Sequence, residues 1–278
     1  MTALQDAARG AARPLRRHPE AGSRGLIAIS YDSPETLKKF ADSRGISFPL
    51  ISDSGSAIIK RYGILNEQQE PGTRSYGIPH PGTFIVDRKG VVTARFFEDA
   101  YQERYTAAAI LVAQGANPDG ASVTAQTNHL TMSASISDST VAPGERLSIV
   151  VVVTPRPTMH VYAPGKHDYR VVRLSVDPQP WLRAHDTRYP PSEIYHFKPL
   201  NERVAVYSKP FRLVQDITIL GTPEIQKSLA VMPTVTIAGT LEYQACDDKV
   251  CYNPARVPLS FTLTTKALDR RPPGWAAR

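Results

Sequence analysis

The strongest constraint on the fold is a change in the spacing of apolar residues part-way along the 278-residue chain. In the first half, the continuous apolar run at 25–31 is typical of a strand buried on both faces of a parallel sheet, and it precedes a helix signal at 32–35. In the second half, short alternating segments follow one another between Pro and Gly turns. The polar stretch 115–128 separates the two patterns. The chain therefore predicts an α/β domain, a linker at 115–128 and an all-β sandwich.

The first half predicts the order β-α-β-α-β-β-α over residues 26–114. Helix starts and stops are marked by Pro34 in a first turn and by Gly45 after the last apolar position. The expected elements are strand 25–31, a helix from Pro34 to Gly45, strand 48–52, helix 54–62, a hairpin at 83–97 and helix 103–114.

The second half, residues 129–267, predicts six or seven short strands and no helix. Alternating apolar segments with turn residues between them are typical of an antiparallel sandwich of the immunoglobulin-like kind. The expected strands are 130–137, 146–154, 160–162, 171–176, 211–217, 234–243 and 257–265.

Composition excludes several classes of protein. A hydrophobic content of 41% is too high for a disordered chain. The net charge of +7 comes largely from arginines in a basic segment at 1–25 and a basic tail at 268–278, which favours solvated ends over a nucleic-acid site. The sequence has no run of eighteen apolar residues, which predicts no membrane span, and 1–25 has no apolar core of an export signal.

Cys246 and Cys251 are the two cysteines of the chain, and four residues separate them. They lie between strand-like runs at 236–243 and 257–265, which predicts a β-hairpin with the pair near its tip. A disulfide here would close a very small ring, worth only about 2 kcal/mol in the chain-entropy model, so a working dithiol is favoured over an inert bridge. Unpaired thiols remain possible, and zinc is disfavoured because a structural site needs four ligands.

The cysteine stretch resembles the N-terminal periplasmic domain of the thiol:disulfide interchange protein DsbD. Its family carries the redox pair in a Tyr-Gln-x-Cys…Cys-Tyr-x-Pro motif on an immunoglobulin-like sandwich, and the resemblance extends from about His129 to Lys266. The loop between the cysteines has four residues here and can have five in the family. The matching residues are Tyr243, Gln244, Cys246, Cys251, Tyr252 and Pro254.

The resemblance also implies which residues assist the pair. It places His160 and Tyr162 on a strand beside the cysteines, and residues two apart on a strand share a face. It matches the loop 195–202 to a cap, with Phe197 and Leu200 as the expected lid. Tyr243 and Tyr252 flank the pair as further supporting residues.

The resemblance implies an order for the two thiols as well. Cys251 would form mixed disulfides with partners and Cys246 would resolve them. Around the pair, Asp247 and Asp248 disfavour a thiolate and Lys249 favours it, so the expected net influence is close to neutral. No metal and no cofactor is implied.

The first half is similar to the AhpC/TSA family, whose members are peroxiredoxin-like antioxidant proteins of the thioredoxin-like superfamily. That family carries its active cysteine before the strand at Leu26, and 1–25 contains no cysteine. We therefore expect an incomplete thioredoxin-like domain without the cysteine unit, and peroxidase activity is disfavoured because it needs a thiolate. The similarity is carried by ISYDSPE at 29–35, FPLISD at 48–53, YGI at 62–64 and GTFIVDRKG at 82–90.

Two functions follow from these features. The favoured one is a thiol:disulfide oxidoreductase that relays electrons through Cys246 and Cys251, with thioredoxin-fold redox proteins or a DsbD-like membrane electron donor as partners. By the resemblance its location would be periplasmic or otherwise extracytoplasmic; a cytoplasmic location is the alternative, because 1–25 has no apolar core of an export signal. The alternative is a non-catalytic protein-binding module with a silent thioredoxin fold and a structural disulfide.

Overall fold

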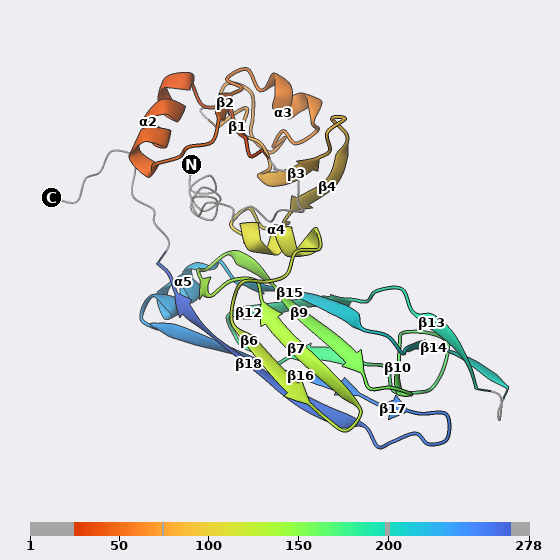
Figure 1. Ribbon diagram of the computed structural model, residues 1–278. Helices are drawn as coiled ribbons and strands as arrows, with labels where there is room; N and C mark the ends of the chain where they lie inside the picture. Colours follow the sequence, from red (N-terminus) through yellow and green to blue (C-terminus); the bar gives the residue numbers. More distant parts are fainter. Residues whose placement is uncertain (1–24, 74, 198–200, 268–278) are drawn as a thin grey trace. The chain divides into compact units, whose positions relative to one another are not determined.

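The computed structural model describes residues 25–73, 75–197 and 201–267. The described chain divides into two compact units between Ala107 and Ala108 (Figure 1). The predicted basic ends lie outside the described residues, apart from Gly25.

The first unit follows the predicted α/β order. Strands β1 and β2 pair in parallel, and β3 and β4 form the predicted antiparallel hairpin. Helix α2 begins at Pro34 because the Ser33 side chain accepts a hydrogen bond from the Thr36 backbone N–H, and it ends where Gly45 adopts a φ of 62°. The elements are β1 (Ala28–Ser30), α2 (Pro34–Arg44), β2 (Leu50–Ser52), α3 (Ala57–Arg61), β3 (Gly82–Val86), β4 (Val92–Phe97) and β5 (Arg104–Tyr105).

The core of this unit is small. Up to Ala107, the buried apolar side chains of the described residues are Leu37, Phe40 and Ile59. The first strand was expected to be buried on both faces, but it is mostly half-buried, and Ile27 just before it is 55% exposed. The physical reason is that β1 pairs with β2 in a two-stranded ladder, separate from the β3–β4 ladder within the described residues.

The second unit is strand-rich. Its elements, from the helix at the boundary onward, are α4 (Ala107–Ala113), β6 (Ser122–Gln126), β7 (Leu130–Ile136), β8 (Thr140–Val141), β9 (Glu145–Pro155), β10 (His160–Tyr162), β11 (Arg173–Val176), β12 (Leu182–Arg188), β13 (Glu193–Phe197), β14 (Glu202–Tyr207), β15 (Phe211–Ile219), α5 (Pro223–Ala230), β16 (Thr234–Tyr243), β17 (Ala245–Cys246) and β18 (Ala255–Thr265).

Two sheets of this unit enclose one hydrophobic core, which confirms the predicted sandwich. One sheet has the order β12-β15-β9-β7-β6 and the other β11-β16-β18-β8. Burial alternates along β7 and β18, as expected for strands with one face inward. Leu130, Ile149 and Leu213 from the first sheet and Ile237 and Phe261 from the second belong to the same cluster of buried side chains.

A third, smaller sheet carries the cysteine pair. Its order is β13-β14-β10-β17, and it lies at one end of the sandwich (Figure 1). The predicted hairpin is present, since β16 and β18 pair in antiparallel register from Thr234 to Tyr243. Between these strands the chain leaves their sheet as β17 and pairs with β10 instead. The loop with the cysteines therefore joins two sheets.

Four features of this unit differ from the sequence-based expectations. Strands β12, β13 and β14 lie where no strand was expected, and the segment 195–202, expected as a cap loop, includes the end of β13 and the start of β14. The stretch 115–128 contains β6, whose residues pair with β7, because its alternating Val123 and Ala125 pack on the core. Helix α5 was not expected, yet Thr222 caps it and Pro223 occupies its first turn, a recognisable start signal. Residues 108–113, expected in the first domain, belong to the second unit, where Val112 packs on Val150 and Val214.

Candidate redox site

Cys246 and Cys251 form a disulfide that a narrow hairpin closes on itself. The backbone N–H of Tyr252 donates to the Ala245 carbonyl at 2.9 Å, and that of Asp247 donates to the Val250 carbonyl at 3.0 Å. The Cα atoms of the two cysteines are consequently 4.1 Å apart. The bridge therefore ties a short loop and joins no distant strands.

The two cysteines differ strongly in accessibility. Cys246 lies on β17 and is 1% exposed, packed with Tyr162, Val204 and Val206. Cys251 lies on the far side of the loop and is exposed. A thiolate that arrives from solvent meets Cys251 first.

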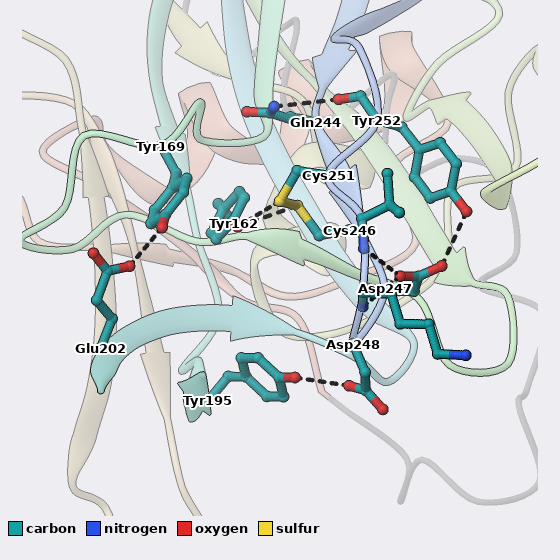
Figure 2. The surroundings of a disulfide bond; sticks show 12 residues. Tyr162, Tyr169, Tyr195, Glu202, Gln244, Cys246, Asp247, Asp248, Cys251 and Tyr252 are labelled. Atoms are coloured by element: carbon teal, nitrogen blue, oxygen red, sulfur yellow. Dashed lines mark hydrogen bonds between the residues drawn. A yellow bond between two sulfur atoms is a disulfide. The ribbon is translucent and has the colours of Figure 1, made fainter. Parts of the chain in front are cut away.

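The Tyr162 hydroxyl contacts both sulfurs of the disulfide. It lies 3.1 Å from Cys246 Sγ and 3.3 Å from Cys251 Sγ (Figure 2). A disulfide sulfur carries no hydrogen, so the hydroxyl is the donor in both contacts. Burial, with added repulsion from Tyr169 and Glu202, raises the pKa of Tyr162 to about 12. Tyr162 therefore keeps its proton at neutral pH.

A second tyrosine orients Tyr162. The ring of Tyr169 stacks on that of Tyr162 with centroids 4.3 Å apart and planes within 6°. The Tyr169 hydroxyl donates to Glu202 at the start of β14 (Figure 2). Neither Tyr169 nor Glu202 was among the expected site residues. Tyr169 lies in an irregular segment after β10, where no periodicity predicts which way a side chain points.

Asp247 organises the loop between the cysteines. Its carboxylate accepts hydrogen bonds from the backbone N–H groups of Lys249 and Val250, both at 2.7 Å, and from the Tyr252 hydroxyl at 3.0 Å. These bonds, the backbone ones foremost, hold the pKa of Asp247 below its usual value. Asp248 accepts a hydrogen bond from the Tyr195 hydroxyl at 2.7 Å. Both charges that disfavour a thiolate are thus engaged in hydrogen bonds.

His160 shares a face with Tyr162, as predicted, and is buried. Its ring lies 4.6 Å from that of Tyr195 and 5.7 Å from that of Tyr162. In the antiparallel ladder of β10 and β17, His160 stands directly opposite Cys246. Burial lowers the pKa of the imidazole, although Asp248, Asp247 and Glu193 oppose that shift.

Phe197 is also brought to the disulfide, and the proposed lid partner Leu200 lies outside the described residues. Phe197 ends β13, whose hairpin with β14 forms one wall of a pocket over the cysteines. The residues that line this pocket are His160, Tyr162, Tyr169, Tyr195, Phe197, Glu202, Val204, Cys246, Asp247, Lys249, Val250 and Cys251.

Tyr243 and Tyr252 do not line that pocket. Tyr243 is fully buried in the sandwich core, where its hydroxyl donates to Thr127 at 2.8 Å. Tyr252 packs its ring 4.5 Å from that of His129 and bonds Asp247 (Figure 2). These two tyrosines hold the strand ends and the loop in place, and Tyr252 reaches the pocket only through its hydrogen bond to Asp247.

Within the part of the chain that the structure describes, no three His, Cys, Asp or Glu side chains gather as metal ligands. The described helices are also too short or too polar to cross a membrane.

The N-terminal region is similar in sequence to peroxiredoxins. Residues 16–95 match the AhpC/TSA family, so this region is thioredoxin-like, as predicted. Alkyl hydroperoxide reductase E of Mycobacterium tuberculosis is 42% identical over 74 residues, which are 26% of this chain and 42% of that protein. Peroxiredoxin Bcp of Escherichia coli is 31% identical over 67 residues, 24% of this chain and 42% of that protein. The chain spans less than half the length of these curated relatives.

Two solved structures resemble the strand-rich architecture weakly. The N-terminal periplasmic domain of ScsB from Proteus mirabilis aligns with a TM-score of 0.36 and 14% identity, over 54% of this chain and 52% of that one. The DsbD N-terminal domain of Neisseria meningitidis, in its reduced form, aligns with a TM-score of 0.30 and 15% identity, over 42% of this chain and 78% of that one.

Proposed function

We propose that this protein is a thiol:disulfide oxidoreductase that relays electrons through Cys246 and Cys251. The observation that supports this most is the asymmetric disulfide under a tyrosine hydroxyl, with one exposed and one buried cysteine. A bridge across six residues adds only about 2 kcal/mol in the chain-entropy model, so stabilisation is a weak reason to have it. Both cysteines of the sequence lie in the second unit, so the proposal assigns the thiol chemistry to that unit.

The exchange runs in two steps. A thiolate of a reduced partner attacks Cys251 Sγ, the Cys246–Cys251 bond breaks, and Cys246 leaves as a thiolate. The Tyr162 hydroxyl, already within hydrogen-bond distance of Cys246 Sγ, then donates to that thiolate. The partner's second thiol attacks the mixed disulfide and releases Cys251. Two electrons pass to this protein, the partner becomes a disulfide, and the reverse sequence reduces the next partner.

The partners in this proposal are thioredoxin-fold redox proteins or a DsbD-like membrane electron donor. The motif shared with the DsbD N-terminal domain supports this class, and so does an exposed Cys251 beside an aromatic pocket. The same resemblance supports a periplasmic or other extracytoplasmic location. Neither cysteine lies at a helix N-terminus, so exchange with random thiols is expected to be slow unless the partner supplies an activated thiolate.

The test is a trapping experiment. Cys246→Ser leaves Cys251 able to attack a partner disulfide and unable to be released, so a mixed disulfide with an oxidised thioredoxin-fold protein accumulates on a non-reducing gel. Cys251→Ser traps far less, because the remaining thiol is buried. Both variants remain folded in thermal melts, since the loss of about 2 kcal/mol is small beside typical domain stabilities of roughly 5–15 kcal/mol.

Two outcomes contradict the proposal. Equal trapping by both variants overturns the roles of the two cysteines. Unfolding of both, with no trapped species and a reduction potential below about −300 mV, favours the alternative of a protein-binding module with a structural disulfide.

A further inference from the structure

We propose that His160 accepts the proton of the Cys246 thiol when that thiol resolves a mixed disulfide on Cys251. This inference rests on the proposed relay and adds a residue to it. A buried thiol needs a nearby proton acceptor, because the thiolate is the nucleophile and burial disfavours its formation.

The backbone register brings the two groups together. His160 and Cys246 are directly opposed in the antiparallel ladder of β10 and β17. Opposed residues point to the same face, with Cβ atoms about 4.5–5.5 Å apart. Both side chains line the pocket over the disulfide, and both are at least 95% buried. The His160 imidazole and the Cys246 sulfur, which must lose a proton, are therefore neighbours on one face of the sheet.

The position of the ring is fixed by its aromatic neighbours. The centroids of the His160 and Tyr195 rings are 4.6 Å apart with planes at 34°, and those of His160 and Tyr162 are 5.7 Å apart in an edge-to-face arrangement. Both contacts are ring-to-ring contacts. Tyr162 itself is a donor to both sulfurs and keeps its proton, so it does not take this role.

The charges that face His160 suit a proton acceptor. Asp247 and Asp248 approach from the loop, Glu193 from β13, and the cation Lys249 lines the same pocket. Burial outweighs the acidic groups and lowers the pKa of the imidazole, so the ring is neutral near pH 7 in the disulfide form. A thiolate on Cys246 adds negative charge beside the ring, which favours the protonated imidazole. The ring is thus neutral before resolution and able to take a proton during it.

The Cys246 Sγ–H proton moves to an imidazole nitrogen of His160, and the thiolate attacks Cys251 Sγ in the mixed disulfide. The Cys246–Cys251 bond forms, the bond to the partner breaks, and the partner leaves as a thiolate. The two protein thiols are oxidised, the partner disulfide is reduced, and the imidazolium returns its proton to solvent or to the departing thiolate.

The test uses the reduced full-length chain and the small disulfide 4,4′-dithiodipyridine in stopped flow. The first release of thiopyridone reports attack by Cys251, and the second reports resolution by Cys246. In the native protein the second rate rises with pH through the pKa of His160, below neutrality. His160→Gln slows the second release by about 100-fold near pH 6–7 and moves its rise to the pKa of the thiol, about 8–9, while the first changes little.

Two further variants separate this role from a structural one. Imidazole added to His160→Ala restores the second rate in proportion to its concentration. His196→Gln is the matched control. His196 is exposed and directly precedes the pocket residue Phe197 on β13, so its side chain points away from the pocket. Both rates of this variant should match those of the native protein.

Several results overturn the inference. One is a second rate in the native protein whose pH dependence follows the pKa of the thiol alone. Another is a His160→Gln pH profile identical to the native one. A third is equal slowing of both phases in the His160 variants without rescue by imidazole. The assay contains no protein partner, so its failure is distinct from failure of the relay, which shows as absence of trapping by Cys246→Ser.

Discussion

At the scale of single residues, the Tyr162 hydroxyl should set how readily Cys246 leaves as a thiolate. A hydrogen bond to a charged group is worth about 1.5–3 kcal/mol, and one pKa unit corresponds to about 1.4 kcal/mol. Tyr162→Phe removes the donor that lies 3.1 Å from Cys246 Sγ. We expect the pKa of the Cys246 thiol in the reduced protein to rise by roughly 1–2 units. Thiolate absorbance followed against pH measures it.

Tyr189→Phe is the control for that experiment. Tyr189 is also partly buried, and its hydroxyl donates to the Val172 carbonyl, whereas the Tyr162 hydroxyl bonds the sulfurs. Its removal should leave the thiol titration unchanged. A Tyr162→Phe protein with the native Cys246 pKa would show that the hydroxyl contacts the disulfide without acting on the thiolate.

At the scale of elements, the loop between the cysteines depends on the charge of Asp247. The folded pKa of Asp247 is depressed by its hydrogen bonds from Lys249, Val250 and Tyr252. Its stabilising effect is therefore complete above the unfolded pKa of about 3.9 and is lost as the pH falls through the lower folded value. Asp247→Asn should melt a few degrees lower than the native protein at pH 7. As the pH falls below that folded pKa the two melting temperatures should converge, as thermal melts at decreasing pH can test.

Asp177→Asn controls for the loss of an acidic side chain elsewhere in the sandwich. Asp177 is exposed and lies just after β11, remote in sequence from the loop. Its melting temperature should follow the native protein at every pH. A constant difference between Asp247→Asn and the native protein down to the lowest pH would contradict the role given to the carboxylate charge.

At the scale of the whole molecule, the two units should differ in resistance to unfolding. The sandwich has a continuous core from both sheets, whereas Leu37, Phe40 and Ile59 are the buried apolar side chains among the described residues up to Ala107. Ile27, Val91 and Tyr101 of the first unit are more than half exposed. Local stability follows buried apolar area, so limited trypsin digestion of the full chain should remove the first unit first.

The expected product is a fragment close to residues 108–267 that retains the disulfide, identified by mass spectrometry with and without reductant. A hydrophobic dye should bind the intact chain and lose signal as the first unit is digested. Survival of a fragment from the first unit, with early loss of the sandwich, would contradict this order of stability.

Local patterns were sufficient for much of the fold and for part of the site. Strand periodicity predicts the hairpin of Thr234–Tyr243 with Ala255–Thr265, and the cysteine pair lies between these two strands. It also predicts the shared face of His160 and Tyr162, because alternation is a property of the chain itself. The α/β order of the first unit follows from helix starts such as Ser33–Pro34. Helix α5 has the same kind of start at Thr222–Pro223 and could have been predicted as well.

The two fold classes and the place of the cysteine pair near a hairpin tip follow from the sequence, since these depend on local spacing and on residue type. The folded structure shows which cysteine is buried, that Tyr169 and Glu202 support Tyr162, and that Tyr243 belongs to the core. Each of these depends on contacts between segments that are far apart in sequence, and on irregular segments without periodicity. The free energy of such contacts comes from burial and cross-strand packing, which no local pattern encodes.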